Sequence, residues 1–191
     1  MGGNAMDVMQ AAITDLEGIK ALLKANHADN VKEEDRADGF VTTNITDEQL
    51  GRLITAENGV TIAKENDTVM AFAFEAPWKF WMEWPMFKYM TEILEEYSFG
   101  DTLLTTENTY QYGPICLDKT VRGTGLFEKV FDFSLAMMKD RYPVMATFIN
   151  QINGRSYAAH TRKAGMTEVG KFDFNGNHYY MMACDTVRSA K

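Results

Sequence analysis

Residues 121–127 read VRGTGLF, which places two glycines one residue apart directly behind an arginine. The apolar run TYQYGPICLD (109–118) predicts a buried strand before this stretch, and a helical pattern starts at Gly125. A turn from a strand into a helix presents unpaired backbone N–H groups and the positive end of the helix dipole. Glycine also lets a ligand approach the backbone closely. The stretch therefore predicts an anion site suited to phosphate oxygens, although a lone Gly-x-Gly is more often a plain tight turn before a helix.

The length and composition bound the class of protein. The chain has 191 residues, of which 46% are hydrophobic and 12% aromatic, and no Pro/Gly/Ser-rich linker divides it. We therefore expect one domain over 1–191, with residues 1–6 flexible. No apolar stretch approaches the roughly 18 residues that a membrane span needs, and the N-terminus lacks a basic segment followed by an apolar one. A cytoplasmic protein without a membrane anchor is expected.

The charge and the cysteines exclude further classes. The formal net charge is −8, which argues against a broad nucleic-acid surface because phosphate binding needs a basic field. An anionic ligand must then be held locally, and Lys119 and Arg122 supply positive charge beside the glycine turn. Cys116 and Cys184 lie far apart in apolar runs and are interpreted as reduced core thiols. With only three histidines, no metal site is expected.

Periodicity and turn residues predict a mixture of strands and helices. Strands are expected at 7–13, 109–118 and 143–150, and in hairpins within 59–76 and 167–185. Helices are expected at 14–27, 46–56, 125–141 and 153–165. The hairpin turns are assigned to 65–67 and 175–177, and Thr46 with Gln49 three residues later is a capping signal. The fold class is α/β.

One segment departs from this alternation. Residues 77–101 contain Trp78, Phe80, Trp81 and Trp84 and then continue with a helical pattern. Such an aromatic cluster is most often part of a core, but it also suits the wall of a ligand pocket or a dimer interface, so a homodimer is possible. The segment is interpreted as an insertion between the third and fourth strands.

Two common phosphate motifs do not fit the glycine turn. A Walker loop ends in Gly-Lys-Ser/Thr, and a dinucleotide fingerprint needs Gly-x-Gly-x-x-Gly after the first strand of a unit. VRGTGLF has neither ending, and it lies past the middle of the chain. Both a P-loop and a Rossmann fold are therefore disfavoured.

The stretch from about Tyr112 to Asp185 resembles the GNAT superfamily of acyl-CoA N-acyltransferases. That family's phosphate motif, Gln/Arg-x-x-Gly-x-Gly/Ala, falls on residues 122–127, with Phe127 where Gly or Ala is usual. Its second motif, Asn-x-x-Ala/Ser-x-x-x-Tyr-x-Lys-x-Gly-Phe, is partly matched. Asn153 and Ser156 agree with it, but Gly165 arrives one residue late, so the tyrosine position falls on His160 counted forward and on Thr161 counted backward.

The resemblance implies a mainly antiparallel central sheet flanked by helices and an acetyl-CoA cosubstrate. It implies that acyl-CoA enters between the strands at 112–118 and 143–150. The residues implied to bind the coenzyme are Ile115, Cys116, Leu117, Arg122, Gly123, Thr124, Gly125, Leu126, Asn153 and Ser156. Phe127 is expected to shift the pyrophosphate contact toward the amides of Gly123 to Gly125.

The implied reaction is direct attack of a primary amine on the thioester through a tetrahedral intermediate. Backbone N–H groups near Ile115 to Leu117 would stabilise the oxyanion. Tyr157 or His160 is the candidate acid for the leaving thiolate. Glu75 and Glu107 are the candidates for the base, because both lie near strand ends on the expected acceptor side. Most glutamates in such places are simply solvated, which is the competing interpretation. Glu107 is the residue chosen.

The amine acceptor is left open by the sequence. Small amines, amino acids, an antibiotic amino group and a protein N-terminus or lysine all fit, and the negative charge only mildly favours a cationic acceptor. Two other interpretations also stand. The chain could be an acyl-CoA-binding regulatory protein of the same fold without turnover, or an unrelated α/β binding domain whose glycine turn is structural.

Overall fold

The computed structural model describes residues 6–34 and 39–187, so the predicted flexibility of residues 1–5 lies outside the described residues. The chain divides into two compact units. The first comes from within 1–36, 40–75 and 113–134, and the second from within 37–39, 76–112 and 135–191. That all of 1–191 forms one domain stays a prediction.

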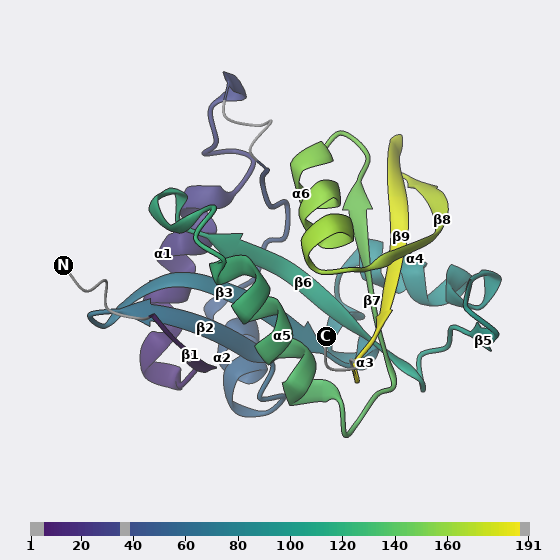
Figure 1. The fold of residues 1–191 in the computed structure, drawn as a ribbon, viewed down its shortest axis with the longest axis horizontal. Coiled ribbons are helices and arrows are strands. Elements are labelled where there is room, and N and C mark those ends of the chain that lie inside the picture. Colours follow the sequence, from purple (N-terminus) through teal and green to yellow (C-terminus); the bar gives the residue numbers. More distant parts are fainter. Residues whose placement is uncertain (1–5, 35–38, 188–191) are drawn as a thin grey trace. The chain divides into compact units, whose positions relative to one another are not determined.

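The first unit contains an antiparallel run of strands, β1 (Asp7–Gln10), β2 (Val60–Glu65) and β3 (Thr68–Ala76), to which β6 (Thr109–Leu117) is added beside β3 (Figure 1). The β2–β3 turn has positive φ at Asn66 and Asp67, 47° and 66°, as a two-residue type I′ hairpin requires. The predicted hairpin is thus confirmed. The predicted strand at 7–13 is too long, because a 3₁₀ turn, η1 (Ile13–Asp15), follows β1.

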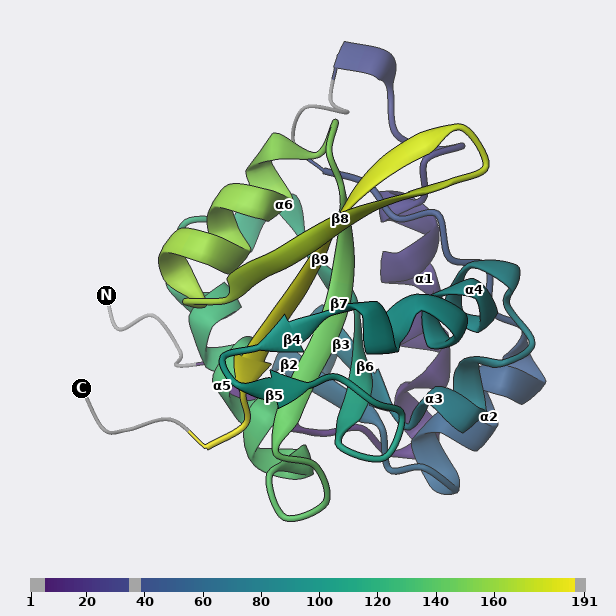
Figure 2. The same cartoon turned by 90° about the vertical axis from the view of Figure 1, so that its right-hand side faces the viewer.

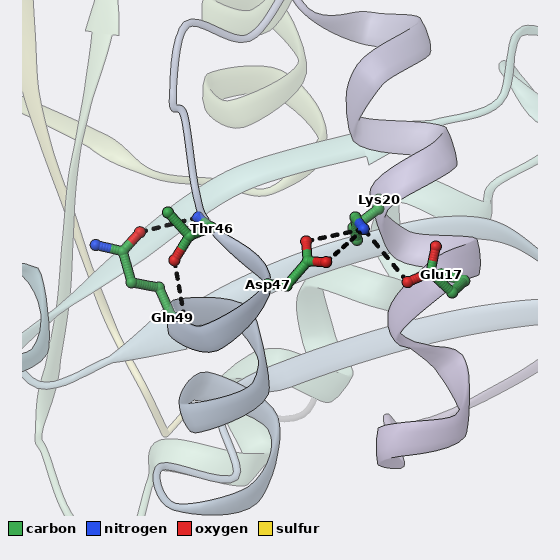
Figure 3. Close-up of polar contacts among 5 residues, drawn as sticks. All are labelled: Glu17, Lys20, Thr46, Asp47 and Gln49. Atoms are coloured by element: carbon green, nitrogen blue, oxygen red, sulfur yellow. Dashed lines mark hydrogen bonds and ion pairs between the residues drawn. The ribbon is translucent and has the colours of Figure 1, made fainter.

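Two helices of the first unit are α1 (Leu16–Asn26) and α2 (Asp47–Thr55). At the start of α2, the Thr46 hydroxyl accepts from the Gln49 amide at 3.1 Å, and the Gln49 side chain accepts from the Thr46 amide at 2.9 Å (Figure 3). Lys20 of α1 donates to Asp47 of α2 at 2.8 Å and also pairs with Glu17 (Figure 3). The predicted capping box is confirmed.

The apolar faces of these elements form the core of the first unit. Apolar residues of α1 and α2 recur at helical spacing and are buried, as are consecutive residues of β2 and β3. The large apolar side chains with no exposed surface include Ile19, Leu50, Leu53, Ile62, Phe72 and Phe74.

Strand β6 contributes residues to both units and leads through the 3₁₀ turn η4 (Lys119–Val121) into α5 (Leu126–Met138). Helix α5 is shorter than the predicted 125–141, because Lys139, Arg141 and Tyr142 only close its last turn. The glycine stretch therefore lies, as predicted, between a strand and the first turn of a helix.

The second unit carries β7 (Val144–Asn150), β8 (Thr167–Phe174) and β9 (Asn177–Asp185), in the order β6-β7-β9-β8 (Figure 2). Strands β6 and β7 are parallel, and the β7–β9 and β8–β9 pairs are antiparallel. Asn175 and Gly176 form the second type I′ turn, with φ of 47° and 75°. The predicted helix at 153–165 is replaced by α6 (Gly154–Ala158) and a π-helix (Ala159–Lys163).

The aromatic segment lies between β3 and β6, where the sequence placed it. It forms α3 (Trp78–Trp81), α4 (Pro85–Ile93) and the 3₁₀ turn η3 (Leu94–Glu96), followed by a small hairpin of β4 (Ser98–Phe99) and β5 (Thr102–Leu103) (Figure 2). Trp78 and Trp81 are buried, and the Trp78 indole donates to Thr109 at 2.8 Å. Phe87 packs on Phe148 of β7 with ring centroids 5.6 Å apart. Most of this cluster is therefore core of the second unit.

The architecture is a mixed α/β fold with a mostly antiparallel central sheet and flanking helices, as expected. None of the helices in the described part of the chain has the length and apolar character that crossing a bilayer requires.

Candidate functional site

The turn between β6 and α5 has the backbone of an anion cradle. Gly123 and Gly125 have φ of 80° and 83°, a left-handed conformation that glycine adopts without strain. A Cβ added at either would meet no atom within 4 Å, so the space above the turn is open. Among the described residues, no acceptor binds the N–H groups of Gly123, Thr124 or Gly125. These donors precede the positive end of a 13-residue helix, α5.

Positive charge is held beside these donors. The Arg122 guanidinium donates to the Asn26 side chain at 3.0 Å, and Lys119 is exposed on η4. The nearby carboxylate of Asp118 caps η4: it accepts from the Thr120 hydroxyl at 2.6 Å and from the Thr120 amide at 2.9 Å. These bonds hold the pKa of Asp118 below its usual value. The positive charge of Arg122 contributes to the same lowering of the Asp118 pKa.

Phe127 packs on another aromatic residue of its own helix. Its half-buried ring stacks on Phe131, one helical turn further along α5, with centroids 6.1 Å apart. That Phe127 shifts the pyrophosphate contact toward the amides of Gly123 to Gly125 stays a prediction. Leu126, the first residue of α5, is buried and serves the core rather than the loop.

The regular ladder of β6 is interrupted at its middle. Pairing with β7 covers only residues 109–111 against 144–146, and the next carbonyl, that of Tyr112, accepts from the Thr147 hydroxyl at 2.6 Å. Gly113 has a φ of 101°, and Pro114 has no N–H to donate, so the ladder cannot continue unchanged. A strand that leaves its neighbour in this way frees backbone groups for other partners.

Beyond the interruption, Ile115 and Leu117 are half-buried and Cys116 is buried. Burial raises the pKa of the Cys116 thiol well above its usual value, so it stays a thiol at neutral pH. Cys184 is likewise buried and free. Both cysteines are core thiols, as predicted. In the predicted coenzyme site, Cys116 could therefore contribute its backbone groups but not its thiol.

The start of α6 is capped by the predicted motif residue. The Asn153 side chain accepts from the Ser156 amide at 3.1 Å, which is an N-cap contact. Asn153 and Ser156 thus fix the helix start within the second unit. Arg155 and Gly154 between them are exposed.

The late arrival of Gly165 is explained by the π-helix. Its wider turns accommodate one extra residue, and the Ala164 amide donates to the Ala159 carbonyl five residues back at 3.0 Å. The residue counted forward, His160, is therefore the buried one, while the Thr161 hydroxyl bonds back to the Tyr157 carbonyl at 2.8 Å. The alternative position, Thr161, is engaged within the helix.

His160 is a neutral imidazole with a defined tautomer. Its Nδ1 lies 2.8 Å from the Ser156 carbonyl oxygen, which can only accept, so Nδ1 carries the proton. Burial lowers the pKa of His160 to about 4. The ring meets Tyr112 of β6 edge-on, with centroids 5.8 Å apart. At neutral pH its one ring proton is committed to the helix, which argues against the predicted role as an acid.

Tyr157 keeps its proton. Its hydroxyl donates to Glu168 of β8 at 2.8 Å, and this hydrogen bond is the main cause that raises the pKa of Tyr157. Its ring packs against that of Tyr180 of β9 at a tilt of 39°, with centroids 4.4 Å apart. Tyr157 and His160 lie on consecutive turns, but the structure gives them separate partners.

The two glutamates differ sharply. Glu107, in the turn before β6, is exposed and accepts from the Thr106 hydroxyl at 2.8 Å, which lowers the pKa of Glu107. Glu75 lies near the end of β3, where the sequence favoured a solvated side chain. In the structure its side chain has no exposed surface. Its Oε1 accepts from Thr61 at 2.7 Å, and Oε2 has no partner among the described residues. Burial raises the pKa of Glu75 to about 8.

Glu75→Gln is expected to remove a pH dependence of stability. The folded state binds the Glu75 proton more tightly than the unfolded state, whose pKa is 4.5, so unfolding releases a proton between pH 4.5 and about 8. Stability from this group is complete below that window and falls as the pH rises, by at most about 1.4 kcal/mol per pH unit.

Urea unfolding at pH 5, 6, 7 and 8 would measure this effect as the difference between the wild type and Glu75→Gln. The exposed Glu48→Gln on α2 is the matched control and should follow the wild type. If the free energies of unfolding of the wild type and Glu75→Gln change with pH in parallel, Glu75 has the same pKa in the folded and unfolded states, which contradicts the prediction.

The structure also shows residues that the sequence did not single out: Asn26 against Arg122, Glu168 against Tyr157 and Thr147 against β6. Each acts on a residue 11 to 96 positions away, and no local pattern marks it. Within the described ranges, no group of three or more His, Cys, Asp or Glu side chains is arranged to hold a metal ion.

Neither a protein-family model nor a curated protein matches this sequence. Solved structures nevertheless share the fold. An acetyltransferase of the GNAT family from Streptococcus pneumoniae aligns with a TM-score of 0.62 at 10% identity, covering 95% of this chain and 99% of that one. A ribosomal-protein-alanine N-acetyltransferase from Brucella melitensis gives a TM-score of 0.61 at 15% identity, with 94% and 99% covered.

A third similar structure, yncA from Salmonella typhimurium, was solved with its cofactor acetyl-CoA. It aligns with a TM-score of 0.62 at 14% identity, over 98% of each chain. The fold of this chain is therefore the fold of the GNAT superfamily, in agreement with the resemblance of its two motifs.

Proposed function

We propose that the protein is an N-acetyltransferase that moves an acetyl group from acetyl-CoA to a primary amine of a small molecule or peptide. The observation that carries this proposal is the turn at 122–125. Before the start of α5, the N–H groups of Gly123, Thr124 and Gly125 have no acceptor among the described residues, and both glycines have a left-handed backbone. Arg122 adds a positive charge in a protein whose net charge is −8. The shared fold supports the proposal, since one similar structure contains acetyl-CoA.

In this proposal the pyrophosphate of the coenzyme binds the amides of residues 123–125 and the Arg122 guanidinium. The interrupted part of β6, Ile115 to Leu117, supplies backbone groups for the pantetheine arm and N–H donors for the oxyanion. An oxyanion held by fixed donors is the usual large electrostatic term in acyl transfer. The neutral amine attacks the thioester carbon, and the C–S bond breaks as the tetrahedral intermediate collapses.

Two proton transfers accompany these steps. The amine loses a proton, which the exposed, ionised Glu107 can pass to water, whereas Glu75 already holds a proton at neutral pH. The leaving thiolate gains one. We assign the donor role to Tyr157, whose phenol stays protonated. Its proton is held by Glu168, as the ring proton of His160 is held by Ser156, so the Tyr157–Glu168 bond must break for the transfer. Orientation of the two substrates contributes as well.

The proposal is tested by following release of free CoA thiol from acetyl-CoA in the presence of single amines. The panel should include small polyamines, amino acids, an aminoglycoside and a short peptide with a free N-terminus. Amine-dependent thiol release, with the acetylated product found by mass spectrometry, is the expected result. Absence of turnover for every amine, in a protein that does bind acetyl-CoA, contradicts the enzymatic part.

Tyr157→Phe is expected to lower kcat roughly tenfold, with little change in the KM for acetyl-CoA. This loss is small for the removal of a general acid, because a thiolate is a good leaving group even without a proton. The thiol-release assay measures both constants. Tyr180→Phe, which keeps the ring that stacks on Tyr157, is the matched control and should retain wild-type rates. If Tyr157→Phe turns over normally, Tyr157 does not donate the proton.

One observation favours a second candidate function. His160, one of the two residues that can take the place of the family tyrosine, is a buried, neutral histidine whose ring proton is engaged. An acyl-CoA-binding regulatory protein of the same fold would tolerate this change, because it performs no proton transfer. Such a protein would gain thermal stability with acetyl-CoA and release no thiol with any amine.

A further inference from the structure

Three polar groups meet at the point where β6 and β7 stop pairing. The ladder between the strands ends at Gln111 and Ala146. Just beyond it, the Thr147 hydroxyl donates to the Tyr112 carbonyl at 2.6 Å. The Gln111 Nε2 donates to the same carbonyl and lies 3.3 Å from the Thr147 hydroxyl oxygen. Both side chains are thus directed at one backbone oxygen beyond the end of the ladder.

These partners fix which way the Gln111 amide points. A backbone carbonyl can only accept, so the nitrogen of the amide must face the Tyr112 carbonyl. The Thr147 hydroxyl gives its hydrogen to that carbonyl and can therefore accept from the Gln111 Nε2. A flipped amide would set its oxygen against the carbonyl oxygen. The Oε1 atom of Gln111 is consequently turned away from both of these groups.

This oxygen is buried without a donor. Gln111 is 1% exposed, and its Oε1 has no hydrogen-bond partner among the described residues. A buried acceptor that lacks a donor costs roughly 1–3 kcal/mol, so native structures contain few of them. An amide oxygen is satisfied by an N–H or O–H group. Because the site is buried, a ligand N–H that reaches it makes a stronger hydrogen bond than it would in water.

Gln111 also lies on the strand that the proposed function assigns to acyl-CoA. In that proposal the phosphates bind at residues 122–125 and the pantetheine arm pairs with residues 115–117, so the thioester end lies toward the earlier residues of β6. Ile115 follows Gln111 by four positions on this strand. The Gln111 side chain extends toward Ile115, since its Nε2 reaches the Tyr112 carbonyl. A donor bound to Oε1 is then placed beside the thioester.

We propose that Gln111 binds the attacking amine, with its Oε1 accepting one N–H of the nitrogen whose lone pair faces the thioester carbon. This inference rests on the proposed acetyl transfer and names a residue for its acceptor. The amide of Gln111 takes no proton: the C–N bond forms, the C–S bond breaks, and the proton that the amine loses passes to water. Orienting the nucleophile in this way lowers the entropic part of the barrier.

The contact also narrows the class of acceptor. The N–H that Gln111 holds stays on the nitrogen in the product, while another hydrogen is lost when the amide bond forms. The neutral acceptor nitrogen therefore needs two hydrogens, as a primary amine has.

Gln111→Met keeps the length of the side chain and removes its amide. It is expected to raise the KM for the amine about tenfold and to leave the Kd for acetyl-CoA, measured by isothermal titration calorimetry, unchanged. The thiol-release assay gives the KM, with the amine of the panel that reacts fastest. Gln10→Met is the matched control, because the exposed Gln10 amide donates to Asn58 at 2.9 Å. It should keep both constants. An unchanged KM in a folded Gln111→Met variant would overturn the inference.

A titration of the wild type with two small cations tests the N–H contact without turnover, and it decides the matter if Gln111→Met does not fold. Methylammonium and tetramethylammonium carry the same charge, but only methylammonium has N–H groups. With CoA bound, methylammonium should shift the side-chain amide signals of Gln111 in proton–nitrogen NMR spectra, and tetramethylammonium should not. The signals of Gln10 should respond to neither cation.

Three results of this titration would overturn the inference. Equal shifts with both cations would mean that the site responds to charge and not to N–H groups. A shift caused by CoA alone would assign Oε1 to an amide N–H of the pantetheine arm. No shift with any of the three would leave Gln111 as a structural residue. If acetyl-CoA binds the wild type in calorimetry, these results remove the inference only, whereas absence of acetyl-CoA binding removes the proposed function and the inference together.

Discussion

Arg122→Glu is expected to weaken acetyl-CoA binding about 100-fold, because the change removes a charged donor worth roughly 2–3 kcal/mol and places a carboxylate beside the phosphates. Arg122 is half-buried and donates to Asn26 at 3.0 Å, so its replacement also breaks this hydrogen bond. Isothermal titration calorimetry with acetyl-CoA measures the loss. The effect should shrink at high salt as the repulsion is screened.

Lys139→Glu is the control for the change in net charge. Lys139 is exposed at the opposite end of α5, and its replacement alters the charge of the protein by the same amount. It should bind acetyl-CoA as the wild type does. Unchanged affinity in a folded Arg122→Glu variant would refute the phosphate assignment, and an equal loss in both variants would reduce it to a long-range charge effect.

Gly59→Ala is expected to destabilise the protein by about 3 kcal/mol through overpacking against a rigid neighbour. A Cβ at Gly59 would lie 2.0 Å from the backbone oxygen of Glu75 and 2.9 Å from Leu53 Cδ1. The backbone cannot yield easily, because the Gly59 amide donates to Leu53 and its carbonyl accepts from the Glu75 amide, each at 2.9 Å. Equilibrium unfolding in urea measures the change.

Gly154→Ala provides the comparison. The added Cβ would meet no atom within 4 Å at the start of α6, so stability should change by no more than about 0.5 kcal/mol. A Gly59→Ala variant as stable as Gly154→Ala would mean that β2 and β3 are packed less closely at this point than the structure shows.

Features set by neighbouring residues could be predicted from the sequence. The Asn66–Asp67 and Asn175–Gly176 turns, the Thr46 cap and the strand–glycine–helix order around Gly125 all depend on residues within a few positions of one another. The GNAT-like order of elements followed from these local signals. The long aromatic segment was also placed correctly between β3 and β6.

Features set by distant residues could not be predicted. The burial of Glu75, the contact of Gly59 with the Glu75 carbonyl and the Asn26–Arg122 bond each join separate elements. The π-helix could be predicted only in part. The sequence shows one extra residue before Gly165, but it does not show that a π-helix takes up this residue or that His160 packs against Tyr112. The burial of His160 therefore needed the structure, and which of His160 and Thr161 takes the place of the family tyrosine stays a prediction.

The central claim is that residues 122–125 bind the phosphates of acetyl-CoA, and a thermal-shift titration tests it most directly. A ligand that binds only the folded state must raise its melting temperature in a concentration-dependent manner. We predict such a rise with acetyl-CoA, retained with dephospho-CoA because the pyrophosphate is still present, and lost in Arg122→Glu. No shift at millimolar acetyl-CoA would contradict the claim and leave VRGTGLF as a structural turn.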